Sequence, residues 1–79
     1  MSRDLEATRR ECARMVEQAE KRVRRIRDLR DAAEGSERVE LNERLWYRER
    51  ILEGLRQALA EVERDTFILS IERDIRRLH

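Results

Sequence analysis

The chain has 79 residues, of which 47% are charged, and it contains no proline and one residue each of Trp, Tyr and Phe. This length allows one domain at most, and the composition argues against a β-sandwich, a β-barrel or an enzyme of ordinary size. The formal net charge of +1 gives no overall attraction to nucleic acid or to a membrane.

Apolar residues recur every seven positions through the first half of the chain. They are Leu5, Cys12, Ala19, Ile26 and Ala33, with Met15 and Leu29 at the intermediate position and Val16 and Val23 beside the stripe. Such a heptad repeat is typical of a helix that packs along one stripe against another helix. We therefore predict a first helix over residues 2–34.

Gly35 and Ser36 separate the two halves of the chain. Glycine readily takes the left-handed conformation that ends a helix, and serine caps the start of the next one. The sequence therefore predicts a turn at residues 35–36 and a second helix over residues 37–78. The apolar residues of the second helix step by three and four: Leu41, Leu45, Leu52, Leu55, Leu59, Val62 and Leu69.

A turn this short places the two helices side by side, so residues 1–79 form a single all-α, coiled-coil-like antiparallel hairpin. The residue numbers of two facing residues then add up to about 70. The facing pairs are Leu29 with Leu41, Ile26 with Leu45, Ala19 with Leu52, Met15 with Leu55, Cys12 with Leu59 and Arg22 with Arg48. A two-helix hairpin encloses no interior, and chains this small usually need a partner. We therefore expect a homodimeric four-helix bundle or a hairpin completed by another helical protein.

The second helix is longer than the first, so residues 70–79 overhang the hairpin. An apolar face formed by Phe67, Ile68, Ile71, Ile75 and Leu78 lies there, nearly opposite the main stripe. Exposed apolar faces of this size usually mark contact sites. Three interpretations stay open: a homodimer contact, a groove for another protein, and a break at residues 65–66 with a short third helix that folds back.

The Arg22/Arg48 layer places two like charges in an apolar seam. Arginine pairs bind dianions such as phosphate or a carboxylate metabolite, which makes the layer a candidate anion site. Alternatively, both side chains reach outward or pair with Glu20, Glu49 or Glu53, or the layer fixes the alignment of the helices.

Residues 21–30 carry six basic side chains against the single acid Asp28. Lys21, Arg24, Arg25 and Arg27 are therefore candidate contacts to a nucleic-acid backbone. No aromatic residues are interleaved to stack on bases, and the neighbouring acids of the second helix offset the charge. Nucleic-acid binding is an alternative function and not the leading one.

A second apolar line on the second helix predicts a seam between hairpins. It contains Tyr47, Ile51, Gly54 and Ala58, and a mid-helix glycine such as Gly54 suggests close approach of another helix. Trp46 lies off the main stripe, with Arg50 at the spacing for a cation–π contact, and is a further candidate for the interface.

The leading hypothesis is a non-enzymatic protein–protein interaction module that self-associates, clamps a helical partner, or does both. In size and layout the chain resembles the small hairpin co-chaperones of type III secretion needles, which implies an adaptor, co-chaperone or regulatory role. Arg48, Glu49 and Arg50 followed by Ile51 and Leu52 also resemble the middle of the all-helical chorismate mutases. That resemblance implies an enzyme or anion-binding protein that uses Arg22 and Arg48. The chain lacks that family's preceding lysine and its late glutamine.

Cys12 is the only cysteine, which excludes an internal disulfide and favours a reducing cytoplasm. The longest apolar run, residues 67–69, is far too short to span a bilayer. The sequence predicts no catalytic residue, metal site or cofactor.

Overall fold

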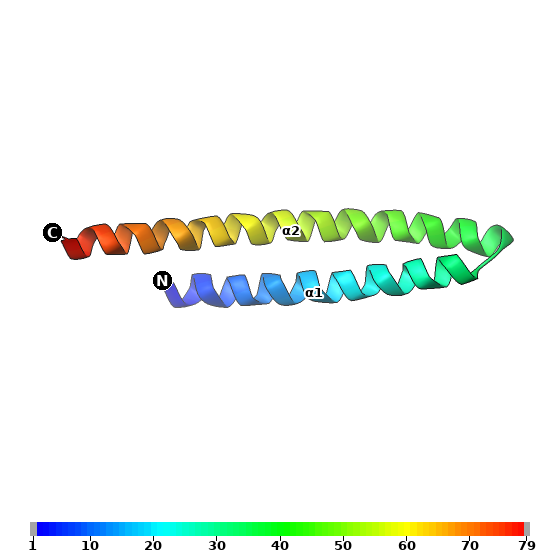
Figure 1. Ribbon diagram of the computed structural model, residues 1–79, viewed down its shortest axis with the longest axis horizontal. Coiled ribbons are helices and arrows are strands. Elements are labelled where there is room, and N and C mark those ends of the chain that lie inside the picture. Colours follow the sequence, from blue (N-terminus) through cyan, green and yellow to red (C-terminus); the bar gives the residue numbers. More distant parts are fainter. Residues whose placement is uncertain (1, 79) are drawn as a thin grey trace.

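A computed structural model describes residues 2–78 as two antiparallel helices (Figure 1). Helix α1 spans Ser2–Ala32 and helix α2 spans Gly35–Leu78. The molecule is a rod with extents of 67 × 15 × 14 Å. This length is that of α2 alone, because 44 residues at about 1.5 Å each extend over about 66 Å. The predicted all-helical hairpin is confirmed.

The connection between the helices lies at Ala33 and Glu34, two residues earlier than the predicted turn at residues 35–36. The N–H of Ala33 donates to the carbonyl oxygen of Arg30 at 3.1 Å, which tightens the last turn of α1. Gly35 has the predicted left-handed backbone, with a φ of 65°. This single residue turns the chain back, so Gly35 and Ser36 already belong to α2.

Helix α2 is continuous through Asp65 and Thr66, so the fold-back of a short third helix does not occur in residues 2–78. The hydroxyl of Thr66 donates to the carbonyl oxygen of Val62 at 2.8 Å, within the helix. The C-terminal end of α2 extends past the start of α1 (Figure 1). The predicted overhang is therefore present, and its last residue, His79, lies outside the described part of the chain.

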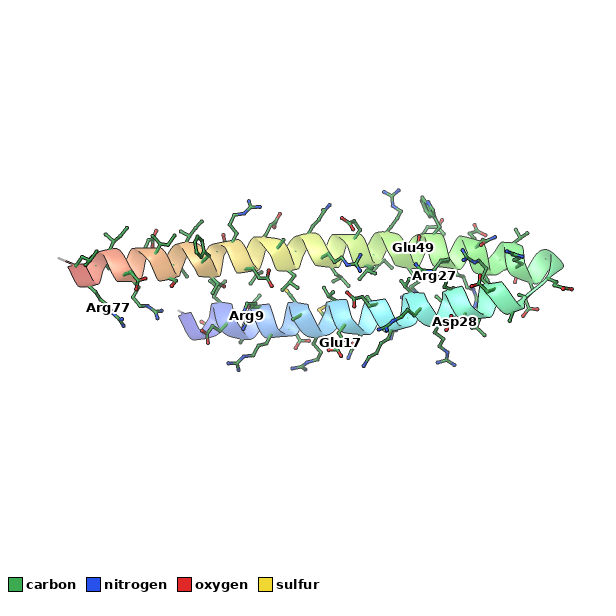
Figure 2. All side chains as sticks on the ribbon, viewed as in Figure 1. Arg9, Glu17, Arg27, Asp28, Glu49 and Arg77 are labelled. Atoms are coloured by element: carbon green, nitrogen blue, oxygen red, sulfur yellow. The ribbon has the colours of Figure 1, made fainter. Side chains whose placement is uncertain are left out.

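The core between the helices is thin. Among the residues whose side chains are described, five apolar ones are buried: Val16, Val23, Ala33, Leu45 and Leu52. Ala19, Ile26, Leu55 and Leu59 pack against this group and are partly exposed. Most other side chains point away from the seam (Figure 2).

The rotation of α1 differs from the prediction. Val16 and Val23, expected beside the stripe, lie at its centre, and Val23 is only 4% exposed. Met15 and Leu29, expected inside the seam, are exposed. Arg22 follows Met15 by seven residues and precedes Leu29 by seven, so all three share one line on the helix. Burying that line would desolvate an unpaired guanidinium, which accounts for the rotation toward the valines.

Candidate interaction surfaces

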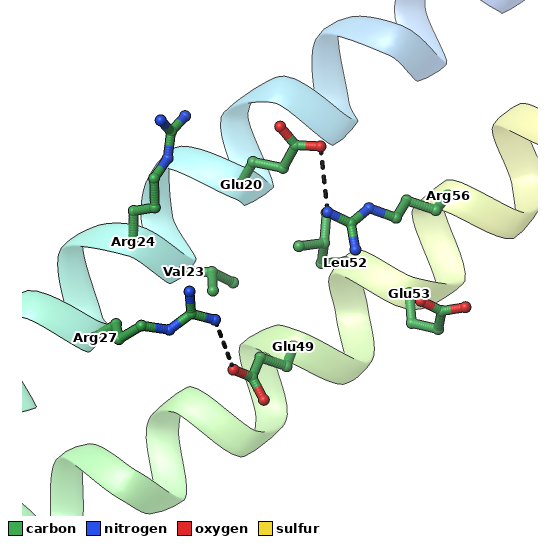
Figure 3. A pocket seen from close by; sticks show the side chains of 8 residues that line it. All are labelled: Glu20, Val23, Arg24, Arg27, Glu49, Leu52, Glu53 and Arg56. Atoms are coloured by element: carbon green, nitrogen blue, oxygen red, sulfur yellow. Dashed lines mark hydrogen bonds and ion pairs between the residues drawn. The ribbon is translucent and has the colours of Figure 1, made fainter.

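The seam between the helices has two flanks, and ion pairs bridge one of them. Arg27 Nη2 lies 3.1 Å from Glu49 Oε1, and Arg56 Nη2 lies 3.4 Å from Glu20 Oε1 (Figure 3). Both pairs join α1 to α2 across the same groove. We call this surface the charged flank; it comprises Glu20, Arg24, Arg27, Glu49, Glu53 and Arg56.

These ion pairs contribute more to alignment than to stability. All four side chains are between about 39% and 52% exposed, and exposed pairs of this kind contribute about 0.2–1 kcal/mol each. They also engage Glu20 and Glu49, which were candidate partners of the Arg22/Arg48 layer. Within one hairpin these two acids therefore pair with Arg56 and Arg27 instead.

The other flank is apolar and open. It contains two adjoining grooves, of about 200 Å³ and about 490 Å³, which share Arg48 and Ile51. We call this surface the apolar flank; α1 contributes Met15, Gln18, Ala19, Arg22, Ile26 and Leu29, and α2 contributes Leu41, Arg44, Tyr47, Arg48, Ile51 and Leu55.

Several large side chains on the apolar flank are only half covered by the hairpin itself. Ile51 is 49% exposed and Leu29 is 51% exposed, and Met15 and Tyr47 are also exposed. Large apolar side chains that gather in one groove normally have a partner. The two flanks are thus chemically opposite, one closed by charge pairs and the other left apolar and uncovered.

Arg22 and Arg48, predicted to face each other in the seam, both line the smaller groove of the apolar flank. Both side chains are exposed, and Arg44 lines the neighbouring groove. Among the described residues these three arginines form no ion pair with an acid. They form a basic segment in the middle of an apolar surface. Arg44 was not among the predicted site residues, although it precedes Ile51 by one heptad.

Gly54 and Ala58 lie on α2 beside the apolar flank. A Cβ atom added to Gly54 would meet nothing within 4 Å, so no part of the hairpin approaches this glycine closely. The close approach of another helix to Gly54, which the sequence predicts, is therefore not made within one hairpin. Trp46 makes the predicted cation–π contact, with the Arg50 guanidinium 4.8 Å from its ring, and Tyr47 meets its ring edge-on at 5.0 Å.

The apolar face near the C-terminus is a separate surface, which we call the tail face. It consists of Phe67, Ile68, Ile71, Ile75 and Leu78, all of them exposed. At this level the residues of α2 that share a groove with Leu5 and Glu6 of α1 are Thr66, Leu69, Ser70 and Arg73. The tail face therefore points away from α1, and the ten predicted interface residues do not form one continuous surface.

The basic stretch of residues 21–30 is partly neutralised. Lys21 Nζ lies 3.5 Å from Glu17 Oε1, and Arg27 pairs with Glu49 across the seam. Arg24 lines the charged flank beside these pairs, and Arg25 is exposed. Acids thus pair with part of the stretch, whereas Arg24 and Arg25 form no ion pair among the described residues.

Within residues 2–78 there is no group of three or more His, Cys, Asp or Glu side chains placed to hold a metal ion. Over the same residues, neither helix has a stretch apolar and long enough to cross a bilayer. Cys12 is a free thiol, partly buried in the seam. No protein-family model matches the chain, and no curated protein or solved structure matches it either.

Proposed function

We propose that this protein is a non-enzymatic protein–protein interaction module. In this proposal two hairpins associate through their apolar flanks into a four-helix bundle, and the tail face offers a second contact to a helical partner protein. The observation that carries it is the difference between the two flanks. The hairpin closes one flank with its own ion pairs and leaves large apolar side chains half exposed along the other.

The size of the core supports the same proposal. Only five apolar residues are buried among those whose side chains are described, which is little for a chain in this size range to stay folded alone. Association of apolar flanks would enclose Met15, Leu29, Tyr47 and Ile51 and give the molecule an interior. Association would then add to the stability of the folded hairpin.

Sedimentation equilibrium across a range of protein concentrations, with helicity followed in the same samples, tests this function. We expect a helical dimer at micromolar concentration that dissociates on dilution into a less stable hairpin. A stable, fully helical monomer at every concentration would contradict self-association. A poorly helical chain that gains structure only with another protein would leave the hetero-complex as the remaining form of the module.

Arg22 and Arg48 support a second candidate function, binding of a phosphate or dicarboxylate anion. They line one groove and have no acid partner in the described chain. Calorimetric titration of phosphate at low ionic strength tests it directly. Saturable binding that disappears in Arg48→Gln would support the anion site, and the absence of heat would remove it.

A further inference from the structure

We propose that the occupant of the apolar flank is a second copy of this chain, lying antiparallel, with α2 packed against α2 and the twofold axis near Gly54 and Leu55. This inference rests on the self-association proposed above and adds its orientation and register. It is drawn from the charges on the apolar flank.

The basic segment of the flank decides the orientation. If two hairpins met with their turns at the same end, Arg22 and Arg48 of both copies would fall in one layer. Four guanidinium groups would then share an apolar seam, and Glu20 and Glu49 already form ion pairs on the charged flank. Like charges brought together in this way cost free energy unless acids join them. An antiparallel pair with its axis away from this layer separates the four groups.

The register follows from one line of α2. Arg44, Ile51, Ala58 and Asp65 are each seven residues apart, so they lie on one line of a helix packed in a coiled-coil manner. When two copies of α2 lie antiparallel, the stretch of this line from Arg44 to Asp65 pairs opposite charges at its ends and apolar residues between them. Arg44 meets Asp65 of the partner subunit, and Ile51 meets Ala58 of the partner subunit.

The neighbouring positions agree with the same register. Arg48 comes opposite Glu61 of the partner subunit, so both arginines that α2 places on the flank gain an acid. Glu61 and Asp65 are exposed and form no ion pair among the described residues. Gly54 lies at the axis, where the absence of a side chain lets two helices approach closely. This is the close contact that nothing within one hairpin makes.

The same register covers part of the overhang. The axis lies close to the middle of α2, so the two copies of this helix overlap over nearly their whole length. The partner's α2 begins opposite residue 74, so on this side it lies beside residues 70–74 of the overhang.

Charge reversal tests the register. We expect Arg44→Glu and Asp65→Arg each to weaken dimerisation at least tenfold, because each places like charges together twice in the dimer. An equimolar mixture of the two variants should recover a heterodimer within a few-fold of the wild-type affinity, because both of its contacts then join opposite charges. The matched controls are Arg50→Glu and Glu43→Arg, which lie one heptad apart on another line of α2 and should leave dimerisation unchanged.

Sedimentation equilibrium of the single variants and of their mixture separates the outcomes. A wild-type dimer whose Arg44→Glu and Asp65→Arg variants dimerise normally, or fail to recover on mixing, overturns the arrangement while leaving self-association intact. A wild-type chain that stays monomeric overturns both.

A distance measurement gives an independent reading of the orientation. A spin label at Arg38→Cys, in a Cys12→Ser background, should lie about 50 Å from its copy in the antiparallel dimer, because about 33 residues of helix at about 1.5 Å each separate the two sites. A label pair closer than about 25 Å would require hairpins with their turns at the same end and would overturn the proposal.

Discussion

At the scale of single residues, the two glycines have opposite roles. Gly35 needs its positive φ, whereas Gly54 lies within a regular helix with open space around it. A mid-helix glycine costs about 1 kcal/mol relative to alanine. Its presence at Gly54 is therefore unexplained by the isolated hairpin and is explained by a helix that crosses there.

We predict that Gly54→Ala stabilises the dissociated hairpin and weakens the dimer. In an Arg44→Glu background, which should be monomeric, the free energy of unfolding by urea should rise by up to about 1 kcal/mol. In the wild-type background, sedimentation equilibrium should show a higher dissociation constant, because the added methyl group holds the helices apart. Gly35→Ala is the control: it should lower stability in both backgrounds, since alanine disfavours a φ of 65°. A tighter Gly54→Ala dimer would contradict the close approach.

At the scale of the helices, two adjacent residues of α2 have different roles, one in the folding of the hairpin and the other in its association. Leu52 is 5% exposed and belongs to the core, whereas Ile51 is 49% exposed and lies on the apolar flank. Leu52→Ala should cost about 2–4 kcal/mol of unfolding free energy, seen as a loss of helicity by circular dichroism. Ile51→Ala should cost the dissociated hairpin much less and should mainly raise the dissociation constant of the dimer. Equal effects of the two substitutions on monomer stability would contradict this division.

The heptad pattern was enough to predict the hairpin, the overhang and the meeting of Arg22 with Arg48. It did not predict the rotation of α1, because Met15 and Val16 belong to neighbouring lines and either line can face α2. The structure decides for Val16 and Val23, since the other line carries Arg22. The rotation of α1 also decides which flank carries the ion pairs and which one is apolar, so the sequence did not predict that difference. One signal was present in the sequence: Arg27 with Glu49 and Glu20 with Arg56 are opposite charges whose numbers have the same sum.

At the scale of the whole molecule, the hairpin carries two apolar surfaces that point in different directions. The apolar flank borders the seam between the helices, and the tail face points away from α1. A single twofold contact through the flank therefore leaves the tail face uncovered. In the proposed dimer, a second contact would then be available at each end, where Phe67 is 64% exposed and Leu78 is 85% exposed.

We predict that the double substitution Ile71→Ser and Ile75→Ser leaves the dimer intact. Serine and isoleucine have similar helix propensities, so the helicity of α2 should not change appreciably. The molar mass by light scattering should stay that of a dimer, while the binding of a fluorescent hydrophobic dye should fall, because the tail face loses two of its five large side chains. The matched control is Ile51→Ser on the apolar flank, which should dissociate the dimer. If the tail variant dissociates and Ile51→Ser does not, the tail face is the self-association contact, and the apolar flank is then the surface left for a helical partner.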